Sequence, residues 1–194
     1  MSDSFLKLCN LAKIEVDNII NSINLDLKTG SDFLSEKNAA SPVVTKIDLE
    51  IEKQLRKLIE CQYPNAGILG EEYAEKLAYE ESEHRFILDP IDGTIALVTG
   101  KPTYTTLMGL EVSREFHSGW VYLPAVKQEY QAIKGSGAFG PSGLLKTSDK
   151  RTWDSIVWST TTPSMFPDLW HKQLLSELHE RCWLSSFGGD AMQY

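Results

Sequence analysis

The chain has 194 residues, of which 27 are acidic and 19 are basic, so its formal net charge is −8, and 42% of the residues are hydrophobic. A chain of this size and apolar content buries roughly 70% of its unfolded surface on folding, so a core forms without disulfides or structural metals. The acidic balance argues against sequence-independent nucleic-acid binding, and no apolar run reaches the ~20 residues that cross a bilayer.

The cysteines are few, odd in number and widely spaced, at Cys9, Cys61 and Cys182, with no CxxC pair. The first residues carry scattered charges, among them Asp3 and Lys13, and lack the apolar block of a signal peptide. These features predict reduced thiols and a cytoplasmic location.

Two amphipathic helices are predicted at the start of the chain. Apolar residues recur at alternating spacings of three and four over 5–23 and again over 47–59. Thr45 is the expected N-cap of the second helix, Asp48 follows three residues later, and Pro64 ends it. Each helix should therefore bury one face.

Two short apolar runs follow, at 66–69 and 85–88, and each leads directly into acidic residues. Glu71 and Glu72 come after the first run, and Asp89 comes after the second. We interpret both runs as strands whose ends place carboxylates for chemistry.

The remaining segments predict an α+β fold with a boundary near residue 145. The apolar and polar alternation over 104–133 is typical of antiparallel strands. The later predicted elements are a glycine-rich hairpin loop at 135–143, a strand at 155–160 and a helix with apolar positions from Phe166 to Leu178. We expect one α+β domain over 1–145 and the beginning of an α/β domain over 146–194. The tryptophans are expected in the core or in a subunit interface.

The strongest chemical signal is the motif Asp89-Pro90-Ile91-Asp92-Gly93-Thr94. Two carboxylates three residues apart at a strand end converge readily on a hard cation, while Gly93 lets the backbone approach an anion and Thr94 adds a hydroxyl where a helix begins. With the pair Glu71-Glu72 and no nearby His or Cys, the pattern predicts magnesium or manganese and a phosphate. The alternative is a structural turn with an aspartate as helix cap.

A second glycine motif is interpreted differently. Residues 135–140 match GxGxxG, the pattern of dinucleotide-binding loops, but Pro141 and Gly143 follow where that fingerprint requires a helix. We therefore expect no nucleotide cofactor.

The acidic motifs together resemble the inositol monophosphatase family of magnesium-dependent, lithium-sensitive phosphomonoesterases. Further matching segments, in chain order, are Ser41-Pro42, Val44-Thr45-x-x-Asp48, Lys134-Gly135-x-Gly137-Ala138-Phe139 and Gly188-Gly189-Asp190. Residues 86–103, with Gly188-Gly189-Asp190, look most like the histidinol-phosphate phosphatase branch. The resemblance implies a layered α/β sandwich, a homodimer and a small phosphorylated substrate, with histidinol phosphate first and inositol monophosphate next. A nucleotide 3′-phosphatase is a weaker alternative.

The resemblance also implies a ligand set for two metal ions. Glu71 and Asp89, with the carbonyl of Ile91, would hold the first ion. Asp89 and Asp92 would hold the second, where Asp92 also faces the phosphate.

The remaining implied roles concern substrate and water. The amides of Gly93 and Thr94 would bind the phosphate, and the Thr94 hydroxyl, bonded to Asp48, would orient or deprotonate the attacking water together with Glu71. Asp190 would contact the substrate's polar group, with a helix cap as its structural alternative.

The sequence also departs from the family pattern. By the resemblance, the second ion would need a further aspartate from a Trp/Tyr-Asp-x-Ala motif after Asp190. The sequence given ends at Tyr194, and Trp153-Asp154 lies too early to supply that aspartate. The expectation is an incomplete C-terminal part. A catalytically incompetent, truncated member of the family that binds a metal or a partner is therefore the alternative function.

Overall fold

The computed structural model describes residues 2–24, 46–79 and 82–193. It divides into two compact units, Met1–Leu145 and Lys146–Tyr194, which are described separately below. The predicted N-cap Thr45 and the Ser41-Pro42 segment lie outside the described residues.

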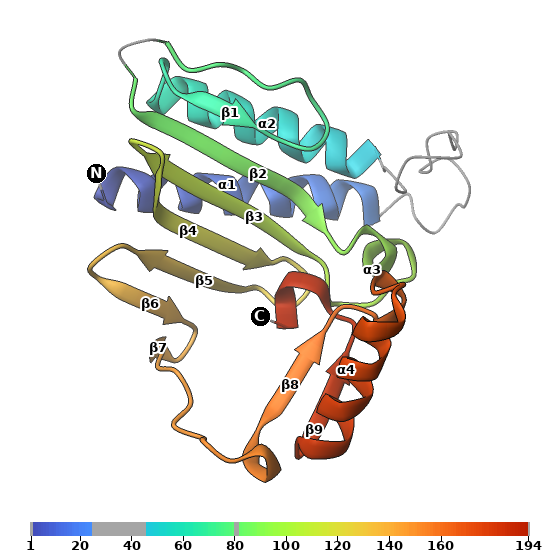
Figure 1. Cartoon of the computed structure of the whole chain (residues 1–194). Coiled ribbons are helices and arrows are strands. Elements are labelled where there is room, and N and C mark those ends of the chain that lie inside the picture. The colour runs from blue at the N-terminus through green and yellow to red at the C-terminus, as the bar shows by residue number, and fades with distance from the viewer. Residues whose placement is uncertain (1, 25–45, 80–81, 194) are drawn as a thin grey trace. The chain divides into compact units, whose positions relative to one another are not determined.

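The first unit contains a seven-stranded sheet in which neighbours in the chain are neighbours in space (Figure 1). β1 (Gly67–Leu69) runs parallel to β2 (His84–Asp92), and the following pairs are antiparallel. The other strands are β3 (Thr105–Val112), β4 (Glu115–Leu123), β5 (Gln128–Ile133), β6 (Gly137–Gly140) and β7 (Gly143–Leu144).

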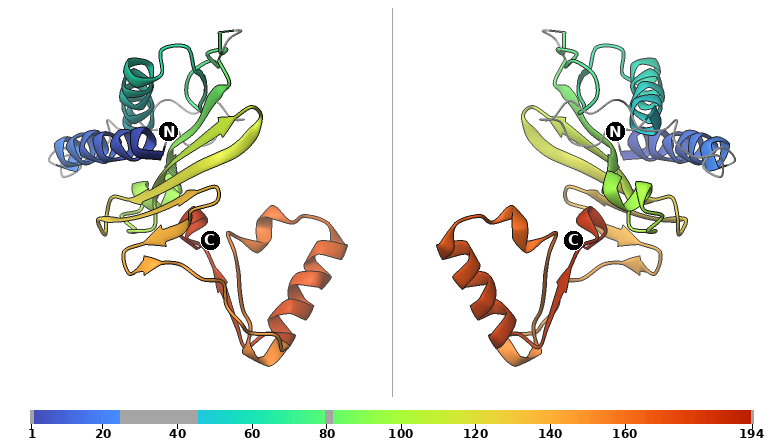
Figure 2. Two further views of the ribbon diagram at one scale, coloured as in Figure 1. Left: turned by 90° about the vertical axis from the view of Figure 1, so that its left-hand side faces the viewer. Right: turned by 90° about the vertical axis from the view of Figure 1, so that its right-hand side faces the viewer.

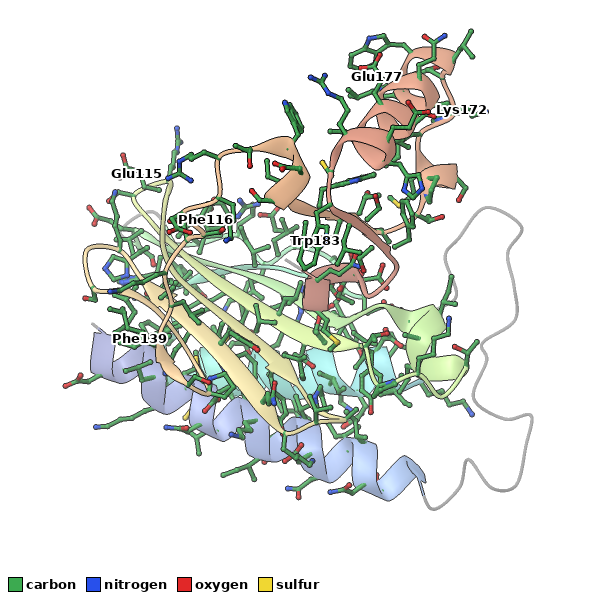
Figure 3. All side chains as sticks on the ribbon, turned by 90° about the horizontal axis from the view of Figure 1, so that it is seen from below. Glu115, Phe116, Phe139, Lys172, Glu177 and Trp183 are labelled. Atoms are coloured by element: carbon green, nitrogen blue, oxygen red, sulfur yellow. The ribbon has the colours of Figure 1, made fainter. Side chains whose placement is uncertain are left out.

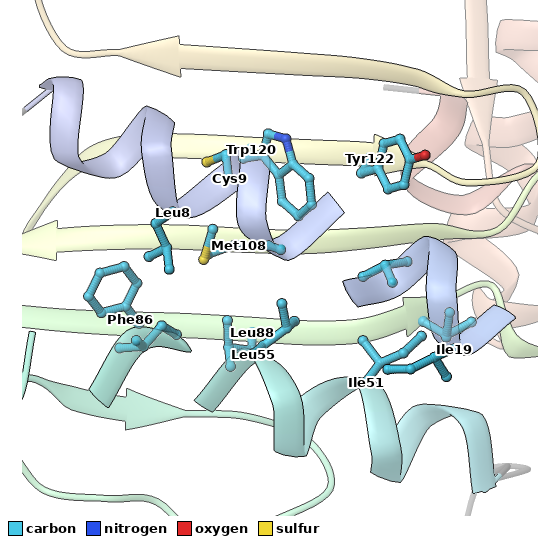
Figure 4. Close-up of a cluster of buried hydrophobic side chains, with 14 of the residues drawn as sticks. Leu8, Cys9, Ile19, Ile51, Leu55, Phe86, Leu88, Met108, Trp120 and Tyr122 are labelled. Atoms are coloured by element: carbon cyan, nitrogen blue, oxygen red, sulfur yellow. The ribbon is translucent and has the colours of Figure 1, made fainter. Parts of the chain in front are cut away.

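Both predicted N-terminal helices are present and cover one face of this sheet (Figure 2). They are α1 (Ser2–Asn24) and α2 (Lys46–Gln62). α1 packs on α2 and β4, and α2 packs on β2. The apolar stripes of the two helices meet alternate strand residues in one core (Figure 4), whose largest members include Trp120, Tyr122, Phe5 and Phe86. The amphipathic periodicity thus identified the buried faces correctly.

A polar tether joins α1 to the hairpin of β4 and β5. The Tyr122 hydroxyl donates to Asp17 Oδ1 at 2.7 Å, and Lys127 Nζ donates to the same oxygen at 2.6 Å. Tyr122 is fully buried, and its ring stacks on Trp120 with 5.7 Å between centroids.

The second unit is a strand–helix–strand element. β8 (Val157–Thr160) pairs in parallel with β9 (Leu184–Phe187), and α4 (Leu169–Arg181) connects them. Parallel neighbours need such a crossover because a tight turn cannot join them. Three 3₁₀ turns complete the unit, η2 (Trp153–Ser155), η3 (Pro163–Met165) and η4 (Asp190–Gln193).

Two local predictions were wrong. The glycine-rich segment is not a single loop, because β6 lies within it and the chain turns on either side. The later helix begins at Leu169 rather than near Phe166, because η3 precedes it and Pro167 intervenes. Of the tryptophans, Trp120 lies in the core, as predicted, whereas Trp153, Trp170 and Trp183 (the last labelled in Figure 3) are exposed, so a subunit interface for these three stays a prediction.

No helix within the described ranges is long and apolar enough to cross a membrane.

Candidate functional site

The site begins where β2 ends. The pairing of β2 with β3 shifts register between Asp89 and Asp92, which indicates a bulge that bends the strand and redirects its side chains. The first residues of β3 hold this bend. Thr106 Oγ1 donates to the Pro90 carbonyl at 2.8 Å, and Thr105 Oγ1 donates to Asp92 Oδ2 at 3.3 Å.

The chain then turns into a short helix, as the sequence predicted. Gly93 has φ 81°, a left-handed conformation that favours glycine, and α3 (Thr94–Val98) follows it. Thr94 Oγ1 lies 3.4 Å from Asp48 Oδ1 on α2 and 3.1 Å from the Ile91 carbonyl oxygen. A hydroxyl has one proton, so it donates to one of these two acceptors at a time.

Asp89 lies among four other acidic side chains. Its pKa is raised to about 8, mainly by its partial burial and further by the negative charges of Glu71, Asp92, Asp48 and Glu72. Asp48 is buried on α2, whereas Glu71 is exposed after β1. Carboxylates from α2, the end of β1 and the end of β2 therefore share one electrostatic neighbourhood.

The two glutamates after β1 belong to this neighbourhood. Partial burial, then Asp48, Glu52 and Glu71, raise the pKa of Glu72 to about 7. Partial burial, then Asp48, Asp92 and Glu52, raise the pKa of Glu71. Groups that repel each other in this way are characteristic of functional sites, because a cation or a proton must relieve the repulsion.

The chemistry of this donor set fits a hard divalent cation. Asp89 Oδ1 is buried and makes no hydrogen bond with any residue that the structure describes, so it is an oxygen acceptor in need of a partner. The other donors are also carboxylate, carbonyl or hydroxyl oxygens, which magnesium and manganese prefer. Within the described residues, however, no three His, Cys, Asp or Glu side chains are close enough together to enclose an ion.

Comparison with known proteins identifies the family of the chain. Residues 5–193 match the inositol monophosphatase family. The chain belongs to that family. This finding confirms the resemblance drawn from the acidic motifs, and the inositol monophosphatase family is generally metal-dependent.

Individual relatives agree with this assignment. The chain is 38% identical over 96 residues to a histidinol-phosphatase of Chlorobaculum parvum, covering 50% of the chain and 36% of that protein. It is 36% identical over 136 residues to inositol monophosphatase 1 of Saccharomyces cerevisiae, covering 67% of the chain and 44% of that protein. The chain therefore spans less than half the length of these two relatives.

The fold is also that of the family. The solved structure of the extragenic suppressor protein SuhB from Bartonella henselae superposes with a TM-score of 0.84 at 24% identity, covering 96% of this chain and 71% of that one. The predicted α+β sandwich is thus confirmed.

Of the residues that the sequence predicted for an inositol monophosphatase site, those before position 95 come together in the first unit. Asp190 belongs to the second unit, where it opens η4 with φ 45° after Gly188 and Gly189, both also at positive φ. Asp190 is described within that unit alone, so its predicted role stays a prediction.

Sequence reasoning missed three residues around the site. Thr105 and Thr106 support the bend of β2, and Glu52 accepts the backbone N–H of Glu72. Glu52 had one available signal: it lies four residues from both Asp48 and Arg56, a spacing that puts all three on one face of α2.

Proposed function

We propose that this chain carries the metal and phosphate site of a magnesium-dependent phosphomonoesterase acting on a small phosphorylated metabolite. The main support is the acidic neighbourhood around Asp89, in which one buried carboxylate oxygen has no hydrogen-bond partner among the residues that the structure describes. The names of the two relatives above favour histidinol phosphate or inositol monophosphate as the substrate.

The chain's own oxygens would hold the cations. Glu71, Asp89 and the Ile91 carbonyl are the proposed ligands of one ion, and Asp89 and Asp92 are those of a second. Magnesium, or manganese in its place, when bound supplies Lewis-acid activation of water and offsets the charge of the phosphate. Thr105 keeps the Asp92 carboxylate in place through its hydrogen bond.

Phosphate and water would meet the turn after Asp92. The amides at the start of a helix have no intrahelical acceptor, so those of Gly93 and Thr94 are the proposed phosphate donors. When the Thr94 hydroxyl donates to Asp48, its lone pairs are free to accept a hydrogen bond from the attacking water, and a proton taken from that water would be matched by the Thr94 proton passing to Asp48. Glu71 is the second proposed acceptor at that water.

An assay of phosphate release tests this proposal. Magnesium-dependent release is measured on histidinol phosphate, inositol monophosphate and a nucleoside 3′-phosphate, the last for the nucleotide 3′-phosphatase alternative. We expect turnover on one of the first two that is inhibited by lithium and lost in Asp92→Asn. Release that persists without a divalent cation, or in Asp92→Asn, would contradict the proposed site.

A second candidate is a family member that binds a metal or a partner chain without turnover. One observation favours the lack of turnover: in the described residues no three acidic side chains are close enough together to enclose an ion, as catalysis by two ions would require. Calorimetric binding of magnesium with no phosphate release from any substrate in the panel would support this candidate.

We also propose that the protein is a cytoplasmic homodimer. A further proposal is that Asp190 contacts the polar group of the substrate. Light scattering on the purified chain tests the dimer. Asp190→Ala tests the contact, because it should raise KM for one substrate of the panel and not for the others.

A further inference from the structure

Glu52 is an unusual residue for the middle of α2, because its carboxylate is fully buried. A buried charge is costly unless it is paired and hydrogen-bonded. Both of its oxygens have partners: Oε1 accepts from Arg56 Nε at 2.7 Å, and Oε2 accepts from the backbone N–H of Glu72 at 2.8 Å. The second bond connects α2 directly to the acidic pair after β1.

Arg56 extends the same connection by one residue. Its Nη2 donates to the Tyr73 carbonyl at 3.1 Å, and its guanidinium lies 5.7 Å from the centre of the Tyr73 ring. The Tyr73 hydroxyl in turn donates to the Leu49 carbonyl at 3.3 Å. Residues 72 and 73 are therefore linked to α2 by three hydrogen bonds.

Gly70 gives independent evidence that the Glu52 carboxylate packs closely against the segment after β1. A Cβ atom at this position would lie 2.1 Å from Glu52 Oε1 and 2.3 Å from Glu52 Cδ, far inside contact distance. Gly70 does not have a positive φ, so backbone conformation does not require a glycine there. The close approach of the Glu52 carboxylate is what requires it.

We propose that Glu52 is a positioning residue for the metal site, which together with Arg56 fixes residues 70–73 so that Glu71 faces Asp48 and Asp92. This inference rests on the proposed function, in which Glu71 is a metal ligand. Glu52 itself touches neither ion nor substrate; it acts through the backbone of Glu72. Arg56 offsets its charge, so that Glu52 supports the acidic site from a fixed position.

The test compares three variants of the full chain. Glu52→Gln keeps the side-chain size but leaves a single acceptor oxygen for two donors, and Gly70→Ala displaces the carboxylate without changing it. Ile59→Val is the matched control, since Ile59 is a fully buried residue of α2 in the hydrophobic core, and its shortening lowers stability while leaving Glu52 and Gly70 as they are. Urea unfolding ranks the stabilities, calorimetry gives the magnesium affinity, and hydrogen exchange reports on the amides of Glu72 and Tyr73.

We expect Glu52→Gln and Gly70→Ala each to weaken magnesium binding about 10-fold or more, as is typical when a residue that orients a metal ligand is lost. The amide of Glu72 should exchange faster in both variants. Ile59→Val should lower the urea midpoint while leaving the magnesium affinity and the Glu72 amide as in the wild type.

Each of the other outcomes has a defined meaning. If the wild type binds magnesium and both variants bind it equally well, Glu52 serves only the stability of the fold and the inference is overturned. If the wild type binds no magnesium, the proposed function fails, and hydrogen exchange alone decides the positioning role. Unchanged exchange at Glu72 in both variants would then overturn it.

Discussion

At the scale of single residues, the Asp89 carboxylate lowers the stability of the folded protein when no cation is bound. Its carboxylate is partly buried, one oxygen lacks a hydrogen bond, and neighbouring acids raise its pKa to about 8. Such strain is common at functional sites, where activity is maintained at the expense of stability. The cation that the family uses would relieve it.

Neutralising this carboxylate should therefore stabilise the metal-free protein. Asp89→Asn is expected to raise the free energy of unfolding by about 1 kcal/mol without magnesium, because on folding the carboxyl must either keep its charge among other acids or take up a proton, and the amide does neither. The same variant should no longer gain stability when magnesium is added. Thermal unfolding with and without magnesium measures both effects.

Glu83→Gln is the control, since Glu83 is exposed and outside the acidic neighbourhood. It removes the same charge and should leave both the metal-free stability and the magnesium response unchanged. An Asp89→Asn protein that is less stable than the wild type, or that still responds to magnesium, would contradict the assignment.

Thr94 should affect the chemical step more than substrate binding. Thr94→Ala removes the hydroxyl that lies 3.4 Å from Asp48 and leaves the carboxylates in place. We expect kcat to fall about 100-fold, within the usual range for lost general acid–base assistance, with little change in KM. Steady-state kinetics with Thr94→Ser as control checks this, because serine retains the hydroxyl. Equal losses in both variants would remove the hydroxyl from the mechanism.

At the scale of elements, the sequence predicted what periodicity and local signals determine. The stripe over 47–59 identified the buried face of α2, and the end of the first strand located Glu71. Asp89 was predicted to follow the second strand, but β2 continues to Asp92, so Asp89 lies within it. The role of Glu52 was not predicted, because the groups that explain its burial, Gly70 and the Glu72 amide, are distant from it in the sequence. Pairing between such segments is a tertiary property that no local pattern records.

The wrong predictions have the same origin. Residues 137–140 read as a loop because glycines dominate them, yet pairing with β5 makes them a strand. The exposed Trp170 and Trp183 are a different case, because they remain candidates for the predicted subunit interface.

The tether between α1 and the β4–β5 hairpin makes an element-scale prediction. Burial, and then the hydrogen bond to Asp17, raise the pKa of Tyr122 above its ordinary value of 10.0. Tyr122→Phe loses a bond to a charged acceptor and should lower the free energy of unfolding by about 1.5 kcal/mol at pH 8. Urea unfolding measures this loss.

The pH dependence of that loss follows from the direction of the shift. Above pH 10 the unfolded tyrosine releases its proton while the folded one retains it, so the wild type loses stability as the pH rises. Tyr122→Phe lacks this loss, and the difference between the two proteins should shrink between pH 8 and pH 11. Tyr130→Phe is the control, because the Tyr130 hydroxyl makes no hydrogen bond within the described residues. A difference in stability that grows with pH would contradict the assignment of the Tyr122 hydroxyl as the donor to Asp17.

At the scale of the whole molecule, the two units differ in how much apolar surface they bury. The core of α1, α2 and the large sheet lies within the first unit. Among the described residues of the second unit, the buried ones are Thr160 and Cys182, and α4 has none. Its two-stranded sheet is also below the size that is stable by itself in water.

Local stability should follow this difference. Opening free energies range from near zero for segments with few buried contacts up to the global value for core strands, so the amides of α4, β8 and β9 should exchange faster than those of β2, β3 and β4. Native-state hydrogen exchange on the full chain measures this, with expected protection in the first unit at least about 100-fold higher. Magnesium should raise protection around Glu71 and Asp89 and leave α4 unchanged, because the proposed ligands of both ions lie in the first unit. Equal protection in the two units would mean that the second unit is stabilised by packing beyond what its buried residues account for.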